Sequence, residues 1–168
     1  MSDRPSAGEA PWLSAAACKV ADRILASHLR AFGRPLLAGC GPQRDARQAA
    51  QELFAAPTVV LAHDGAADPR LIYANRAALL LWRRTWVTMV GLPSRLTAEP
   101  VERQERSAAL ERARLRDALQ GYAGIRIDSG GRRFRIENAR LWTLRDGLRD
   151  GLGSPCGQAA VFGRWWWL

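Results

Sequence analysis

The spacing of apolar residues predicts two helices in the first third of the chain. Between residues 12 and 32, hydrophobic side chains recur at intervals of three, four and seven, which is the period of a helix with one buried face. Ser14 is placed to cap the first turn of this helix. A second helix is predicted from about residue 44 to residue 54. We expect residues 1–11, which are small and polar and include proline, to be disordered.

From residue 58 onward, strand patterns appear. Residues 58–62 and 70–74 are short runs separated by a turn, so they predict an antiparallel pair. Asn75 follows the second run and can cap a helix that ends at Trp82. A longer helix is expected over residues 97–119, after a broken region of short turns. The apolar stripe of that longer helix is predicted to be Val101, Ala108, Leu115 and Leu119.

The last third of the chain alternates as strands do. Residues 122–128 and 132–144 predict a hairpin around the turn at 129–131, because its glycines take positive φ without strain. The alternation shifts near residues 137–138, which predicts a β-bulge there. Residues 156–166 form the final predicted strand. The residues of the first hairpin strand that share one face are Ala123, Ile125 and Ile127.

The predicted order is therefore two helices, two strands, two helices and three strands. This order indicates an α+β fold in which a five-stranded antiparallel sheet carries crossover helices on one face. Residues 12–54 form a helical leader to the domain, and residues 55–168 form the domain itself.

The chain is strongly basic. It has 25 basic and 16 acidic residues among 168, with a formal net charge of +9 and a pI near 11.0. Because Lys19 is the only lysine, 24 of the basic residues are arginine. Arginine suits phosphate and so favours a nucleic-acid partner, whereas codon bias in a GC-rich genome explains the same excess without a function. We favour codon bias, and since no nucleic-acid-binding motif accompanies the arginines, we expect any contact with nucleic acid to be non-specific.

The cysteines and the N-terminus indicate the compartment. Cys18, Cys40 and Cys156 are widely spaced and odd in number, so they form neither a disulfide framework nor a CxxC pair. The N-terminus lacks the apolar core of a secretory signal, and no apolar run approaches the ~20 residues that span a bilayer. We therefore expect a cytoplasmic protein with no membrane contact.

Several segments resemble PAS domains. Residues 71–78 look like the second PAS strand running into the first core helix, and residues 124–142 resemble the third and fourth strands. The resemblance is closer to the PAS-related MEKHLA domain, in its stand-alone bacterial form, over about residues 53–167. The segments that carry it are His63-Asp64, Asp68-Pro69, Tyr73-Ala74-Asn75, Leu92-Pro93-Ser94-Arg95, Ala98-Glu99, Gly131-Arg132-Arg133-Phe134, Ile136-Glu137 and 157–162.

The resemblance implies a sensory or interaction module in signalling rather than a known reaction. PAS domains commonly hold a ligand between the inner face of the sheet and the crossover helices. A covalently bound flavin would need a cysteine at the start of a crossover helix, and haem would need an axial histidine, usually on such a helix. The cysteines lie elsewhere, and His28 and His63 lie in the leader and at a strand end, so neither cofactor is expected. The ligand itself stays unknown at this point.

Eight polar or aromatic residues are candidate contacts to a ligand. They are Trp82, Trp86, Arg95, Glu99, Arg133, Glu137, Trp142 and Gln158. In one interpretation, an arginine binds a carboxylate or phosphate group of the ligand, while Glu137 and Gln158 fix the orientation of the ligand. In the other, which we favour, the two arginines and two glutamates pair with one another, and the tryptophans belong to the core.

Three consecutive tryptophans, residues 165–167, raise the question of what covers the sheet. Consecutive strand residues face opposite ways, so these indoles lie on both faces. One face packs under the crossover helices, and the helix of residues 14–32 is the expected cover for the other. That helix can come from the same chain or from the partner in a homodimer.

A non-catalytic sensory or interaction module is the function that we expect. One alternative is a small enzyme acting on an anionic substrate held by Arg95 and Arg133. Another is a transcriptional regulator associated with nucleic acid.

Overall fold

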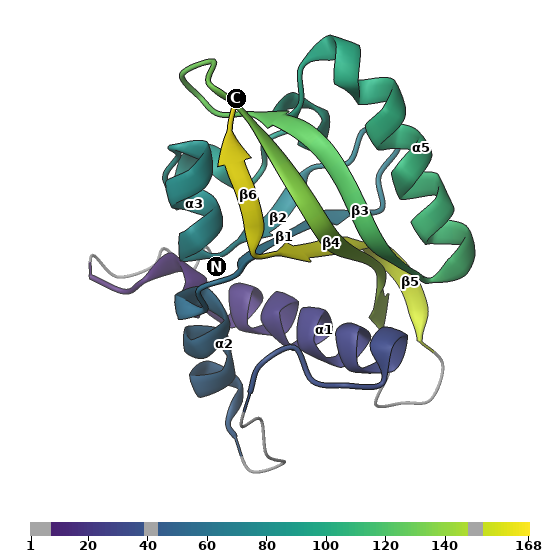
Figure 1. The fold of residues 1–168 in the computed structure, drawn as a ribbon. Coiled ribbons are helices and arrows are strands. Elements are labelled where there is room, and N and C mark those ends of the chain that lie inside the picture. Colours follow the sequence, from purple (N-terminus) through teal and green to yellow (C-terminus); the bar gives the residue numbers. More distant parts are fainter. Residues whose placement is uncertain (1–7, 39–43, 148–152) are drawn as a thin grey trace.

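The computed structural model describes residues 8–38, 44–147 and 153–168 (Figure 1). The helices of these residues are α1 (Ala15–Phe32), α2 (Ala46–Ala55), α3 (Arg76–Trp82), α4 (Trp86–Met89) and α5 (Pro100–Arg116), with short 3-10 turns at Pro11–Leu13 and Ser94–Thr97. The strands are β1 (Val59–Asp64), β2 (Leu71–Ala74), β3 (Ala118–Ile127), β4 (Arg133–Asp146), β5 (Ser154–Phe162) and β6 (Arg164–Trp167). The segment 1–7 of the expected disordered terminus and Cys40 lie outside the described residues.

The strands form one antiparallel sheet. Its order is β2-β1-β5-β4-β3, and β6 also pairs with β4. The final strand predicted for residues 156–166 is two strands, β5 and β6, with Gly163 between them. β5 pairs with residues 140–146 of β4, and β6 then pairs with residues 134–137 of the same strand. The α+β class and the antiparallel sheet are confirmed, with β6 added to the five predicted strands.

The structure has the two helix caps and the β-bulge that the sequence predicts. The Oγ atom of Ser14 accepts a hydrogen bond from the Ala17 N–H at 3.1 Å, which caps α1 as predicted. The side chain of Asn75 caps α3 in the same way. At the predicted bulge, Asn138 takes a φ of 53° and the pairing of β3 with β4 shifts register.

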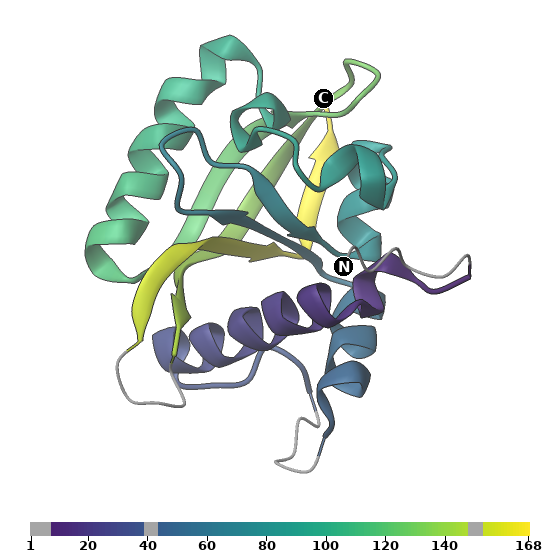
Figure 2. The same ribbon diagram turned by 180° about the vertical axis from the view of Figure 1, so that it is seen from behind.

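Helices cover both faces of the sheet. α5 runs along β3, while α1 crosses one end of β4 (Figures 1 and 2). Along β1, Val59 belongs to a core that includes α3 and α5, and Val60 belongs to a second core that includes α1 and α2. We call the first side the inner face and the second the outer face. The cover of the outer face comes from the same chain, with Ile24 of α1 fully buried on it.

The tryptophan triplet alternates between the faces as expected. Trp165 and Trp167 pack on Phe134 on the inner face, with ring centroids 6.1 and 5.6 Å from that ring. Trp166 is paired with Arg135 in the ladder and is 41% exposed. The leader helix therefore covers the part of the outer face near Trp142 and leaves Trp166 open to solvent.

The predicted apolar stripe of the long helix was wrong. Val101 and Leu115 are 77% and 73% exposed, and Leu119 lies in β3 rather than in the helix. α5 instead buries Ala109 and Ala113, together with an arginine described below. Small side chains on this stripe let the helix lie close to the sheet. Leu110 beside them is partly buried against the same core.

The face of β3 that is buried is not the one that carries its isoleucines. Ala123, Ile125 and Ile127 share a face as predicted, but their side chains are only partly buried. The buried face carries Tyr122 and, on the same side, a glycine and an arginine. β3 therefore presents polar groups to the inner core. None of the helices in the described part of the chain is long and apolar enough to cross a membrane.

Candidate ligand-binding site

A cavity of about 60 Å³ lies between the inner face of the sheet and α5. Much of its lining is apolar, with Leu61, Trp82, Ile136 and Phe162 among the residues that contribute. The polar side chains that line it are His63, Thr97, Arg106, Tyr122, Arg126 and Gln158. They come from β1, β3, β5, α5 and the turn before α5, so residues far apart in the sequence meet at this site.

Arg126 enters the cavity from β3. It is 7% exposed, and its Nη2 donates a hydrogen bond to the Tyr122 hydroxyl oxygen at 2.9 Å. Its Nη1 donates to the carbonyl oxygen of Ile125 at 2.8 Å. The guanidinium also lies 5.5 Å from the centre of the Tyr122 ring. The tyrosine therefore fixes the position of the arginine under α5.

Gly124 makes room for this pair. It lies between Tyr122 and Arg126 on the same face of β3. A Cβ atom at this position would lie 2.6 Å from the Tyr122 hydroxyl oxygen and 3.0 Å from Arg126 Nη1. Both distances are shorter than ordinary contacts, so any side chain here would push the tyrosine or the arginine aside.

Arg106 enters from the opposite side, on α5. Its side chain is 9% exposed, and burial together with the charge of Arg126 lowers its pKa to about 10. A guanidinium with that pKa still carries its charge at neutral pH. Two positive charges thus face the same small space.

Two further polar atoms in the lining are buried without a hydrogen-bond partner among the described residues: His63 Nε2 and Trp82 Nε1. His63 Nδ1 lies 2.8 Å from the carbonyl oxygen of Asp64, and since a carbonyl only accepts, Nδ1 carries the hydrogen. Burial lowers the pKa of His63, so the ring is neutral and Nε2 presents a lone pair. Trp82 Nε1 can only donate.

Gln158 connects the sheet to the crossover helix. Its Nε2 donates to the carbonyl oxygen of Leu110, in the middle of α5, at 2.8 Å. His63 faces it across the ladder between β1 and β5. This contact holds α5 over the cavity and leaves the amide oxygen of Gln158 as a further acceptor.

Of the eight residues predicted as ligand contacts, the structure brings Trp82 and Gln158 to the cavity. Trp86 lies against Tyr73 in the outer-face cluster, and Trp142 packs edge-on against His28 there. The other four lie away from the cavity: Arg95, Glu99, Arg133 and Glu137.

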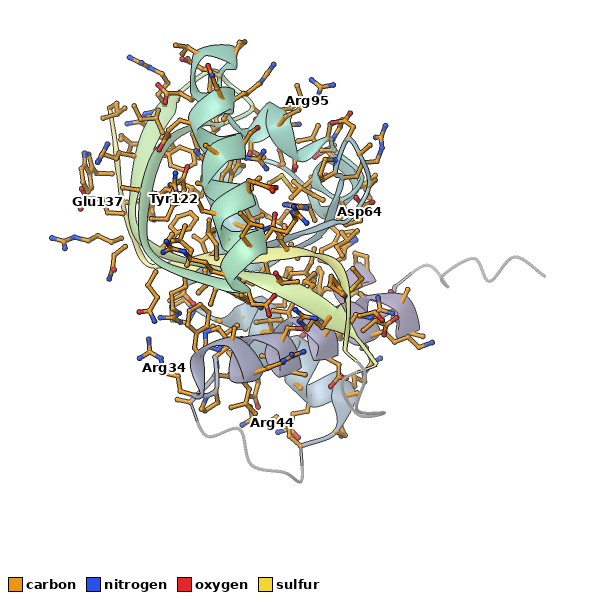
Figure 3. The ribbon with its side chains drawn as sticks, turned by 90° about the vertical axis from the view of Figure 1, so that its right-hand side faces the viewer. Arg34, Arg44, Asp64, Arg95, Tyr122 and Glu137 are labelled. Carbon is orange, nitrogen blue, oxygen red and sulfur yellow. The ribbon has the colours of Figure 1, made fainter. Side chains whose placement is uncertain are left out.

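The ion pairs of those four residues only partly follow the predicted bracing. Arg95 pairs with Asp68 at 3.2 Å, and Glu137 pairs with Arg135 at 3.4 Å. Arg133 and Glu99 form the one pair drawn from within the predicted set, at 4.0 Å, in the described part of the chain. Figure 3 shows Tyr122 between the strands and α5, whereas Glu137 points away from the sheet on its other side and Arg95 lies at the periphery.

Sequence reasoning missed the arginines and the tyrosine of the cavity. A signal was present, because Arg126 stands between Ile125 and Ile127 in a strand that alternates. The isoleucines suggested that their face is the buried one. A search for polar residues on the opposite face of an alternating strand would have found Tyr122 and Arg126.

The family model for the MEKHLA domain matches residues 18–167. The chain belongs to the MEKHLA domain family. The match begins within α1, so the leader helices are part of the region that defines the family. None of the curated proteins compared with this MEKHLA chain is similar enough in sequence to count as a relative.

Solved structures with the same fold as this MEKHLA domain include PAS and light-oxygen-voltage domains. A PAS domain from Colwellia psychrerythraea aligns with a TM-score of 0.59 and 13% identity, over 68% of this chain and 92% of that one. An RNA-binding light-oxygen-voltage receptor aligns with a TM-score of 0.61 and 18% identity, over 76% of this chain and 35% of that one. The Cys71Ser mutant of Vivid aligns with a TM-score of 0.52 and 16% identity, over 83% and 96%. At these identities the likeness shows the fold, which is that of PAS and light-oxygen-voltage domains.

The residues of the cavity do not fit a flavin or a haem. Sites that hold drug-sized ligands enclose about 300–1,000 Å³, whereas this cavity is about 60 Å³. Of the cysteines in the described residues, Cys18 lies on α1 and Cys156 on β5, and both pack with the outer-face cluster. His63 does line the cavity, but as a neutral side chain already bonded to Asp64 and with room for only a few ligand atoms beside it.

Proposed function

We propose that this protein is a PAS-type sensory module that binds a small ligand in the cavity between α5 and the inner face of the sheet. The observation that supports the proposal is the convergence of buried polar side chains on this cavity, which otherwise has an apolar lining. Convergent polar groups in an apolar pocket are the usual composition of a ligand site. A purely structural core would not need them, because buried polar groups cost free energy unless they are paired.

α5 is the element that would report the ligand. It is held on the sheet by small residues, Ala109 and Ala113, and by the Gln158 contact to Leu110, while most of its length is exposed. A ligand between the helix and the sheet would add contacts to both. Its binding would therefore stabilise α5 against local opening.

The proposal includes no catalytic step. Arg95 and Arg133, which the enzyme alternative requires as substrate contacts, lie outside the cavity. Among the described residues no carboxylate lines it, so an acid–base pair would have to come from the ligand. The proposal also places the protein in the cytoplasm, as the sequence suggests.

A homodimer is part of the proposal as well. The buried side of α1 is occupied by the chain's own sheet, so a second copy would contact the exposed side of this helix, where Leu29 is 50% exposed. Light scattering of the purified protein tests this part. A mass of one chain at micromolar concentration would remove the dimer and leave the ligand site untouched.

The experiment that tests ligand binding uses a matched pair of variants on α5. Leu110 lines the cavity and Leu115 is exposed, so Leu110→Phe fills the site and Leu115→Phe makes the same change in solvent. The full chain is purified, denatured and searched by mass spectrometry for a released small molecule, and a metabolite library is screened by thermal shift. We expect a ligand with the wild type and with Leu115→Phe, but not with Leu110→Phe. A ligand that binds all three proteins equally, or no ligand for any of them, would contradict the proposal.

A further inference from the structure

The two arginines of the cavity have no acidic partner. Arg106 and Arg126 are 9% and 7% exposed, and neither takes part in any of the eight ion pairs found among the described residues. Some arginines elsewhere in the chain do form ion pairs, although they are more exposed. Arg145, for example, donates to Asp117 at 2.6 Å, and Arg114 pairs with Glu111 at the same distance. The two arginines that line the cavity are thus both buried and without a carboxylate partner among the described residues.

Two unpaired charges of the same sign are costly in such a place. Removing a charge from water is strongly unfavourable unless an opposite charge compensates it, and two guanidinium groups in one cavity also repel each other. The lowered pKa of Arg106 has these two causes, burial first and the charge of Arg126 second. Arginine does not escape by losing its proton at neutral pH. The missing component is a negative charge that the described part of the chain does not supply.

We propose that the ligand of the cavity is a small carboxylate-type anion held between Arg106 and Arg126. This inference rests on the proposed function, because it names the class of ligand for the same site. The guanidinium fork matches the planar geometry of a carboxylate and can bind both of its oxygens.

The donors available in the cavity agree with this class. Arg126 uses two of its five N–H groups, on Tyr122 and Ile125, and no hydrogen bond occupies the guanidinium of Arg106 among the described residues. Trp82 Nε1 adds one more unpaired donor. Donors directed at the ligand therefore outnumber the acceptors, which are His63 Nε2 and the amide oxygen of Gln158.

The size of the cavity limits the anion to a few heavy atoms. A single water requires about 10–15 Å³ of cavity, and the space here is about 60 Å³. Acetate and its short homologues are of this size. A nucleotide or a lipid headgroup with its chain would not fit without moving α5.

The test compares acetate with acetamide, which has the same shape and no charge. Thermal unfolding of the full chain is followed at constant ionic strength, with sodium chloride replaced stepwise by sodium acetate, or with acetamide added at the same concentrations. We expect a saturable rise of the melting temperature with acetate, about 5–10 °C at a concentration about 100-fold above Kd. Acetamide should leave the melting temperature unchanged.

Three variants assign the effect to the cavity. Arg106→Met and Arg126→Met should abolish the rise with acetate, whereas Arg112→Met, on the exposed side of α5, should keep it. Without acetate, Arg106→Met should melt at or above the wild-type temperature, because it removes an uncompensated buried charge. If either methionine variant fails to fold, Arg126→Lys keeps the charge but loses the fork, and it should raise the Kd for acetate about tenfold.

The outcomes separate this inference from the proposed function. An equal rise in all variants, or the same rise with acetamide, overturns the anion site. A neutral molecule released from the purified protein, with no effect of acetate, also overturns it and leaves the proposed function intact. No released molecule and no effect of any probe would overturn both.

Discussion

Replacing Asn75 with alanine would remove a side chain that holds three elements together. The Oδ1 atom of Asn75 accepts from the Val60 N–H at 3.0 Å and from the Ala78 N–H at 3.1 Å. Its Nδ2 donates to the Thr58 carbonyl oxygen at 2.7 Å, with longer contacts to two carbonyls at the end of α2. The side chain is fully buried, so it connects α2, the start of β1 and the start of α3 away from water.

The cost of this substitution can be summed from the lost contacts. Loss of the cap of α3 costs about 1 kcal/mol. The Val60 N–H becomes a buried donor without a partner, and the Thr58 carbonyl loses its strongest contact, which adds about 1–3 kcal/mol for the first and less for the second. We expect the free energy of unfolding to fall by about 3–5 kcal/mol, a large part of the 5–15 kcal/mol typical of a domain.

Urea unfolding followed by tryptophan fluorescence measures the effect, with the change taken from the midpoint at constant slope. Asn75→Asp is the informative comparison, because it keeps the capping oxygen but places a second oxygen against the carbonyls that Nδ2 now contacts. Those carbonyls disfavour the charged form, so its pKa in the folded protein is raised. Its stability relative to the wild type should therefore increase as the pH falls from 7 towards 5. A loss below 1 kcal/mol for Asn75→Ala would refute the reasoning.

Three further predictions test other contacts. Gly124→Ala should lower stability by about 1–3 kcal/mol in the same urea assay, because its Cβ would lie 2.6 Å from the Tyr122 hydroxyl oxygen; an unchanged midpoint would contradict the packing described for β3. Burial and the charge of Arg140 lower the pKa of His28 to about 4, so the unfolded state takes up the proton first and the free energy of unfolding should fall as the pH drops from about 6.5 towards 4. His28→Gln should reduce the dependence of the free energy of unfolding on pH in this range. A variant whose unfolding free energy depends on pH as steeply as that of the wild type would contradict the role of His28. Asn138→Val should cost about 1–2 kcal/mol at a φ of 53°, while Asn138→Gly should not destabilise the protein.

Features encoded by adjacent residues could be predicted from the sequence. The cap at Asn75 needs only the amide and the next turn of α3. The turn between β3 and β4 needs Gly131, which takes a φ of 83°, and the Asp128 side chain, which accepts from the N–H groups of Gly130 and Arg132. The bulge at Glu137–Asn138 was visible because the alternation of apolar residues slips there. Each of these depends on the local backbone, so tertiary contacts did not overrule it.

The buried faces of β3 and α5 could not be predicted in the same way. Alternation shows that Ile125 and Ile127 share a face, but which face is buried depends on what packs against it. α5 packs against Tyr122 and Arg126 instead, and it does so through Ala109, Leu110 and Ala113 rather than through Val101 and Leu115. The cavity lies between α5 and the face of β3 that carries Tyr122 and Arg126. Because alternation alone did not show that this face is buried, its arginines were not among the predicted contacts.

Side-chain NMR of the arginines tests the anion site most directly. The Nε–Hε signals of Arg106 and Arg126 are assigned with the two methionine variants and followed as acetate is added to the full chain at constant ionic strength. The two signals should shift together with a single Kd, remain in place with acetamide, and leave the signal of exposed Arg112 unchanged. Signals that stay in place with acetate, or that shift in parallel at all arginines, would contradict an anion held between Arg106 and Arg126.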